Sequence, residues 1–222
     1  MRSFITIVIL LTVAAWAQSQ PNQNVQDPAA GAVLERVANR FKSIKSLQSD
    51  YELVVEDRKD QSRNINSGNL LLKNKMYRLV NEETTVFFDG TTMWTYDAGK
   101  NEVTITSPEL QSGDFMSNPS GFFDTYQRDF KYRYIRQTSK NGSPCHELDL
   151  FPKNLNQPYS RIKVFVHTQT SFPVVVSSIG KDGVDFTVAL SNVTVDKDIP
   201  DATFVFDPTR YKKVEIIDMR GL

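Results

Sequence analysis

The sequence predicts a mostly β fold, an antiparallel meander or barrel that follows a single amphipathic helix. Two observations support this prediction. Apolar residues recur at helical spacing in one early segment only, and from residue 51 onward short apolar runs alternate with polar residues. Turn-forming residues separate these runs at intervals of eight to twelve residues, which is typical of antiparallel β architectures. No Gly-rich phosphate loop or βαβ alternation interrupts the pattern.

The helix is expected to begin at Asp27-Pro28, with Asp as the N-cap and Pro at the first helical position. Leu34, Val37, Phe41 and Ile44 then follow at spacings of three, four and three residues, and charged or amide side chains occupy the other side. This pattern indicates one apolar helix face that packs against the rest of the domain.

The strands are expected from alternation and from turn signals between them. Asp89-Gly90 is a strong hairpin signal between two such runs. The expected strands centre on residues 51–55, 70–72, 86–88, 93–96, 103–105, 132–135, 147–150, 162–166, 174–179, 186–190 and 204–206.

The segment 108–126 breaks this rhythm. It contains Phe115, Met116, Phe122 and Phe123 among Gly, Ser and Asn residues, so it is too rich in turn formers for a strand and too apolar for an ordinary loop. Two interpretations stay open: a short helical plug that completes the core, or a movable lid over an apolar cavity.

The N-terminus has the order of a secretory signal, with Arg2, an apolar run over residues 4–15, and small residues at Ala15 and Ala17. A membrane anchor is the alternative, but a run of about a dozen residues is short of the ~20 that span a bilayer. We therefore expect a signal peptide over 1–17, a polar disordered leader over 18–26 and a single domain over 27–222, exported without a lipid of its own.

The residues that usually carry catalysis are scarce, so we expect no enzyme, no cofactor and no metal. Cys145 is the single cysteine, which excludes an internal disulfide. Cys145 and His146 are adjacent on a strand and should point to opposite faces, which excludes a thiol–imidazole dyad, and His167 is expected at the surface. The 26 basic and 26 acidic residues balance, which does not favour nucleic acid as a partner.

The chain is instead rich in large apolar side chains, with 14 Phe, 8 Tyr, 2 Trp and 5 Met. Most of these are expected to fill the core. One helix cannot cover the whole face of a many-stranded sheet, however, so the remaining apolar residues should line a concavity suited to a lipid ligand.

Five stretches resemble, in order, the outer-membrane lipoprotein carrier family (LolA). The most specific are a D-G-x-x-x-W-x-Y hairpin that starts at Asp89 and a closing F-x-F-x-P that starts at Phe204. The stretches span nearly all of the expected domain: residues 44–51, 67–73, 88–97, 162–166 with 173–183, and 199–208.

The resemblance implies an incomplete, unclosed antiparallel β-barrel with an N-terminal helix, a helical lid and a hydrophobic cavity between sheet and lid. It also implies a periplasmic carrier, expected as a monomer, that accepts lipoproteins from an inner-membrane ATP-driven release complex and delivers them to an outer-membrane acceptor. The family often has an Arg-Pro pair after the lysine that ends the second strand. Here Lys73 is followed by Asn74, so Lys75 and Arg78 are the candidates for holding the lid.

A triacylated lipoprotein exposes roughly 45 methylenes at about 0.8 kcal/mol each, so it needs shelter in water. Alternation predicts that Trp94 and Tyr96 share one face. The expected acyl-chain-lining residues are Leu34, Val37, Phe41, Met76, Phe88, Trp94, Tyr96, Phe115, Met116, Phe122 and Phe123. Two other functions stay open: a lipid- or lipoprotein-sensing periplasmic module of the same fold, and a cell-envelope β-sandwich that binds another protein.

Overall fold

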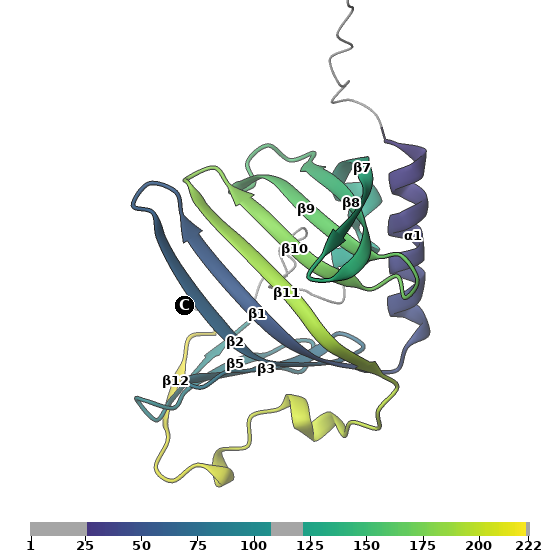
Figure 1. Ribbon diagram of the computed structural model, residues 1–222. Coiled ribbons are helices and arrows are strands. Elements are labelled where there is room, and N and C mark those ends of the chain that lie inside the picture. The colour runs from purple at the N-terminus through teal and green to yellow at the C-terminus, as the bar shows by residue number, and fades with distance from the viewer. Residues whose placement is uncertain (1–25, 108–121, 221–222) are drawn as a thin grey trace, which may run out of the picture.

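The computed structural model describes residues 26–107 and 122–220. These form one twelve-stranded sheet with a long helix at one side (Figure 1). The elements of the first half are α1 (Pro28–Ser43), β1 (Leu47–Asp57), β2 (Ser62–Lys73), β3 (Met76–Val80), β4 (Thr84–Phe88), β5 (Met93–Asp97) and β6 (Glu102–Thr106). Those of the second half are η1 (Phe122–Asp124), α2 (Tyr126–Asp129), β7 (Phe130–Lys140), β8 (Ser143–Pro152), β9 (Tyr159–His167), β10 (Pro173–Gly180), β11 (Val184–Val195), η2 (Asp201–Phe204), η3 (Pro208–Arg210) and β12 (Glu215–Asp218).

The helix α1 begins where Asp27 and Pro28 predict. One Asp27 carboxylate oxygen accepts a hydrogen bond from the N–H of Ala29 at 2.9 Å, which caps the helix. The other oxygen accepts from the N–H of Tyr134 in β7 at 3.0 Å. The same side chain therefore starts the helix and attaches it to the sheet.

The sheet is open, because its order is β12-β6-β5-β4-β3-β2-β1-β11-β10-β9-β8-β7 and the two outermost strands do not pair within the described residues. Every pairing is antiparallel except that of β12 with β6. The predicted fold, a mostly β protein with an unclosed antiparallel barrel, is confirmed.

The strand register assigns each residue to one of two faces. Leu72 pairs with Tyr77, Tyr77 with Phe88, and Phe88 with Met93, so these side chains share a face. This face, called the inner face here, holds the main apolar core, and α1 packs over its β7 end.

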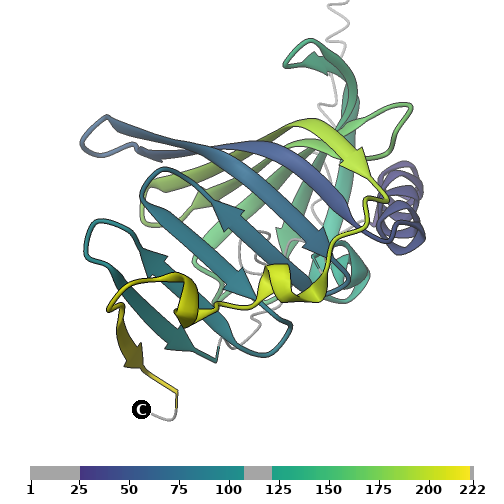
Figure 2. The ribbon, with the colours of Figure 1, turned by 90° about the horizontal axis from the view of Figure 1, so that it is seen from below.

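The opposite, outer face of β3–β6 is covered by the C-terminal segment 199–214. Figure 2 shows this yellow segment crossing the strands. Phe206 and Tyr211 pack there with Phe87 and Val103 in a second apolar cluster. The Nζ of Lys73 holds the start of the segment, donating to the carbonyl of Ile199 at 2.6 Å.

The C-terminal segment also corrects the sequence prediction. Residues 204–206 alternate like a strand, yet Asp201–Phe204 forms the 3₁₀ helix η2, in which Thr203 N–H donates to the carbonyl of Pro200. The last strand is instead β12, whose short run Glu215–Asp218 carries no alternation.

Gly68 allows β3 to approach β2. The two strands pair only from Asn69 to Lys73, and Gly68 is the first residue beyond this pairing. A Cβ at Gly68 would lie 1.8 Å from the carbonyl oxygen of Val80, which is a backbone atom that cannot rotate away. Only glycine fits at this point, where the sheet passes from its long central strands to the short strands β3–β6.

Gly68→Ala should therefore destabilise the fold by several kcal/mol, because backbone must move to admit the methyl group. Urea unfolding followed by circular dichroism would measure this. Gly99→Ala is the control, because a Cβ there meets only the Asp97 carboxylate at 3.4 Å. Equal stability of the two variants would contradict the steric argument.

The outer face of β7–β9 carries a buried charge ladder. Glu147, 3% exposed, pairs with Arg136 at 2.9 Å and Lys163 at 3.1 Å. Asp149, 2% exposed, pairs with Arg161 at 3.1 Å and Arg133 at 3.5 Å.

Burial alone would raise the pKa of Glu147, but the hydrogen bonds and charges of Lys163 and Arg136 outweigh it and leave the pKa below its ordinary value.

Because the folded-state pKa of Glu147 is lowered, its stabilisation is complete above the ordinary carboxyl pKa and is lost as pH falls through the folded value. Glu147→Gln should cost about 1–3 kcal/mol at pH 7 and flatten the loss of stability on acidification. The measurement is the free energy of unfolding between pH 3 and pH 7. Glu56→Gln, in the exposed pair with Arg63, should change little.

Candidate functional site

Beneath α1 the inner face is filled. Leu34 and Val37 are fully buried, and the ring of Phe41 stacks on Phe123 with centroids 5.6 Å apart. Phe122 packs edge-on against Phe123 at 4.9 Å. The structure brings together these five residues, which the sequence predicts as a cavity lining, but packs them into a continuous core.

Residues 26–107 and 122–220 do not fill the other part of the inner face in this way. Leu53, Leu79, Val86 and Met93 are half-buried and pack against the edge of the core, and Phe186 is 42% exposed. Leu79 pairs with Val86, and Phe186 pairs with Val55, two positions along β1 from Leu53. We call these five residues the inner apolar row.

The inner apolar row offers apolar surface to the solvent. Its side chains are aliphatic, thioether or aromatic, and each retains exposed apolar surface whose burial contributes about 25 cal/mol per Å². Phe88, a predicted lining residue, is 2% exposed and pairs with Met93, so it forms the floor beside the row. No group of three or more His, Cys, Asp or Glu suited to a metal ion occurs among residues 26–107 and 122–220.

Met76, Trp94 and Tyr96 lie on the outer face, which corrects the expectation that they line the cavity with Phe88. Met76 pairs with Lys73, and Trp94 with Phe87, which places them on the face that the C-terminal segment covers. Tyr96 packs on Tyr211 with centroids 4.4 Å apart. Trp94 and Tyr96 lie on the same face of the sheet, as predicted. Alternation alone, however, does not show which of the two faces is the inner one.

The candidate latch residues do not face the inner side either. Lys75 is exposed in the turn between β2 and β3. Arg78 is on the outer face, with its guanidinium 4.9 Å above the ring of Phe87. Phe115 and Met116 lie outside the described residues, as does most of the expected lid.

The thiol and imidazole of Cys145 and His146 point apart. Cys145 packs with Phe165 and Val175 on the outer face, where burial raises the pKa of its thiol. The Nδ1 of His146 lies 3.0 Å from the hydroxyl of Tyr134, and burial, with a smaller contribution from Arg36, lowers the pKa of the imidazole. The two side chains cannot act as a nucleophile and its base.

The sequence prediction missed the residues of the inner apolar row because it chose residues by side-chain type and position in the chain, and neither reveals which apolar side chains stay exposed. The Asp89-Gly90 hairpin could have identified one of these residues, Met93, from the sequence. Once Phe88 is assigned to the core, the hairpin places its partner Met93 on the same face and Trp94 on the other.

Comparisons with known proteins identify the fold and no activity. A family model described as "-like: Uncharacterized protein" matches residues 81–189. A relative from Methanocaldococcus jannaschii, "Uncharacterized protein MJ0687", is 23% identical over 190 residues and covers 85% of this chain. The match takes up 54% of that protein, so this chain spans about half the length of the curated relative.

Among solved structures, an uncharacterized conserved protein from Thermus thermophilus has a TM-score of 0.54 at 10% identity, over 85% of this chain and 98% of that one. MucB has a TM-score of 0.50 at 13% identity, over 82% of this chain and 64% of that one. A LolA superfamily protein from Nitrosomonas europaea is more distant, with a TM-score of 0.42 at 14% identity, over 80% and 98%. Within the described residues, no helix has the length and apolar character needed to cross a bilayer.

The packing of the C-terminal segment on the outer face should contribute to the stability of the fold. Phe206→Ala should cost about 3–5 kcal/mol, because the ring fills the space between Phe87 and Tyr96. Thermal unfolding would measure the loss. The neighbouring Val205→Ala is the control, since Val205 is 39% exposed and should change little. Similar losses in both variants would contradict the assignment of Phe206 as the anchor of this cover.

Proposed function

We propose that this chain is an exported lipid-binding module that shelters acyl chains against the inner apolar row. The observation that carries the proposal is the row itself: five large apolar side chains on the core side of an unclosed sheet that retain exposed surface. Soluble domains normally bury such side chains, and large apolar side chains that stay exposed on the core side of a sheet are candidates for a binding surface.

The finer proposal is a periplasmic carrier of lipoproteins. It rests on the resemblance of residues 44–51, 88–97 and 199–208 to the lipoprotein carrier family, and on the signal-like residues 1–17. In this role the protein would take acylated clients from a release complex at the inner membrane and give them to an acceptor at the outer membrane. Uptake of a client from the donor and its release to the acceptor both require a moderate affinity for acyl chains. A partly exposed apolar row suits this requirement better than a closed cavity.

A protein-binding role is the second candidate. MucB, which has a similar fold, has been solved in complex with MucA. By analogy of fold alone, this chain would bind lipid as a signal and change its affinity for a partner protein. The two roles differ in whether bound acyl chains are passed on.

The test of acyl binding uses two exposed residues on opposite faces of the same end of the sheet. Phe186 is 42% exposed on the inner face, and Ile65, on the opposite face of the β1–β2 hairpin, is 50% exposed. Phe186→Glu should weaken binding of a fluorescent fatty-acyl probe at least tenfold, because a carboxylate would have to be desolvated beside the chain. Ile65→Glu should leave the affinity unchanged.

Both substituted positions are exposed, so both variants should keep the melting temperature of the parent protein. Equal probe affinity in the two variants, or no probe binding by the parent, would overturn the acyl-binding proposal. Movement of a labelled lipoprotein from donor vesicles into the soluble fraction and on to acceptor vesicles would support the carrier role. Binding without onward transfer would favour the signalling role.

A further inference from the structure

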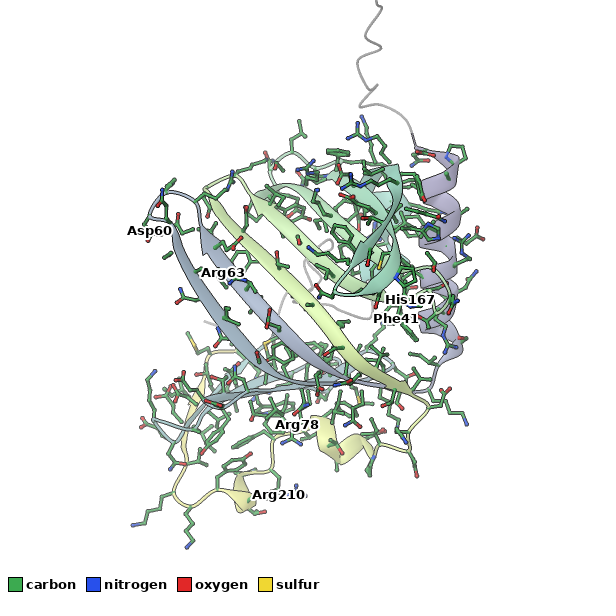
Figure 3. All side chains as sticks on the ribbon, in the orientation of Figure 1. Phe41, Asp60, Arg63, Arg78, His167 and Arg210 are labelled. Atoms are coloured by element: carbon green, nitrogen blue, oxygen red, sulfur yellow. The ribbon has the colours of Figure 1, made fainter. Side chains whose placement is uncertain are left out.

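A small cavity lies between the outer face of β3–β4 and the C-terminal segment, away from the inner apolar row. Its volume is about 220 Å³, and its charged and polar wall residues are Arg78, Thr203, Asp207, Arg210 and Tyr211. Figure 3 shows Arg78 and Arg210 on the side of the sheet where the C-terminal segment runs. Nothing in the acyl-binding proposal uses this cavity.

Arg78 has no charged partner among the described residues. Its Nε is buried without a hydrogen bond, and within residues 26–107 and 122–220 its guanidinium forms no ion pair. Its specific contact is with the ring of Phe87, 4.9 Å from the guanidinium carbon. A half-buried cation without a counter-ion is costly, and proteins usually provide one.

Two acidic groups of the C-terminal segment, Asp201 and Asp207, are already engaged. Asp201 pairs with Lys73 at 2.7 Å. Asp207 pairs with Arg210 at 3.2 Å and also accepts from the N–H and hydroxyl of Thr209. Arg78 therefore adds an uncompensated positive charge to an interface in which these other charges are paired.

Side chains, not the backbone, supply the donors. The N–H groups of Thr203, Val205, Arg210 and Tyr211 bond to carbonyls within the segment. The side-chain donors on the walls are the guanidinium groups of Arg78 and Arg210 and the hydroxyls of Thr203 and Tyr211. The carboxylate on these walls, Asp207, already accepts from Thr209 and pairs with Arg210. The Arg78 guanidinium is therefore left to bind another anion, and its parallel N–H groups match phosphate oxygens.

We propose that this cavity binds a phosphate group, with Arg78 as its principal ligand and Arg210 as the second. A phosphate supplies the missing counter-charge, and about 220 Å³ accommodates it together with part of the molecule that carries it. The ring of Phe87 holds the Arg78 guanidinium in place and limits its freedom in the unbound state.

The experiment is a nuclear magnetic resonance titration of the full chain with inorganic phosphate. Phosphate replaces chloride in the buffer, so that the ionic strength stays constant. Saturable shifts at residues 78 and 200–211 are expected. Arg78→Met should weaken phosphate binding at least tenfold. Arg78→Lys should weaken it several-fold, because lysine lacks the paired N–H groups of the guanidinium, and Arg210→Met should also weaken it several-fold. Arg63→Met, an exposed arginine on the β1–β2 hairpin paired with Glu56, is the matched control and should bind like the parent (Figure 3).

The Arg78 variants should fold, since Arg78 forms no ion pair within the described residues. Arg210→Met and Arg63→Met each break only an exposed ion pair, and the melting temperature checks all the variants. Absence of saturable binding in the parent, or equal affinity in Arg78→Met and Arg63→Met, would overturn the proposal. Vesicles of phosphatidylcholine with and without phosphatidylglycerol identify the source. Arg78-dependent binding to the anionic vesicles alone would assign a lipid headgroup, and binding of inorganic phosphate without vesicle binding would assign a soluble phosphorylated molecule.

Discussion

The two faces of a single continuous sheet have to be removed from water by different means. Successive side chains alternate between the faces, so each of the twelve strands contributes one set of residues to each. A sandwich solves this problem with a second sheet, and a closed barrel solves it by filling its interior. The described part of this chain does neither, and the positions of its helix, its C-terminal segment and its partly exposed apolar residues follow from that constraint.

The two covers differ in kind. On the inner face, α1 presents a stripe of small and medium apolar residues, with Val33, Leu34 and Val37 buried against the sheet, and Asp27 attaches the helix to β7. On the outer face, an irregular segment supplies isolated aromatic anchors such as Phe206, and Lys73 attaches its start. Among the described elements the helix packs mainly against β7 and η1 at one side of the sheet, and the inner apolar row over β1–β5 and β11 stays partly exposed.

Much of the architecture could be predicted from local signals. Asp27-Pro28 marks the start of the helix, and Asp89-Gly90 lies at the turn between β4 and β5, because capping and turn chemistry act within a few residues. The predictions that failed concern elements whose structure depends on contacts with distant parts of the chain. The alternation of Phe204 and Phe206 resembles a strand, but no neighbouring strand of the described sheet is available to pair with it, whereas β12 exists only because β6 offers an edge.

The same reasoning limits the prediction of the site. Period-two alternation shows that Trp94 and Tyr96 lie together, but the choice of face is made by Phe206 and Tyr211, more than a hundred residues later in the chain. Side-chain size is no guide either, since Trp94 and Tyr96 belong to the outer cluster while Leu79, Val86 and Met93 remain half-buried on the inner side. The unpaired state of Arg78 depends on where the carboxylates of the C-terminal segment lie, which alternation does not reveal.

The pairing of β1 with β11 has a kinetic consequence. These strands lie near the centre of the sheet, yet they join residues far apart in sequence: Asn192 donates to Asp50, 142 residues away. Just beyond the strand ends, the Ser46 hydroxyl donates to the carbonyl of Lys197, 151 residues away. Each half can form its own meander from local hairpins, but the halves join only after most of the polypeptide has been synthesised. Such a topology folds slowly, and its nascent chain remains open for longer than a protein assembled from neighbouring hairpins alone.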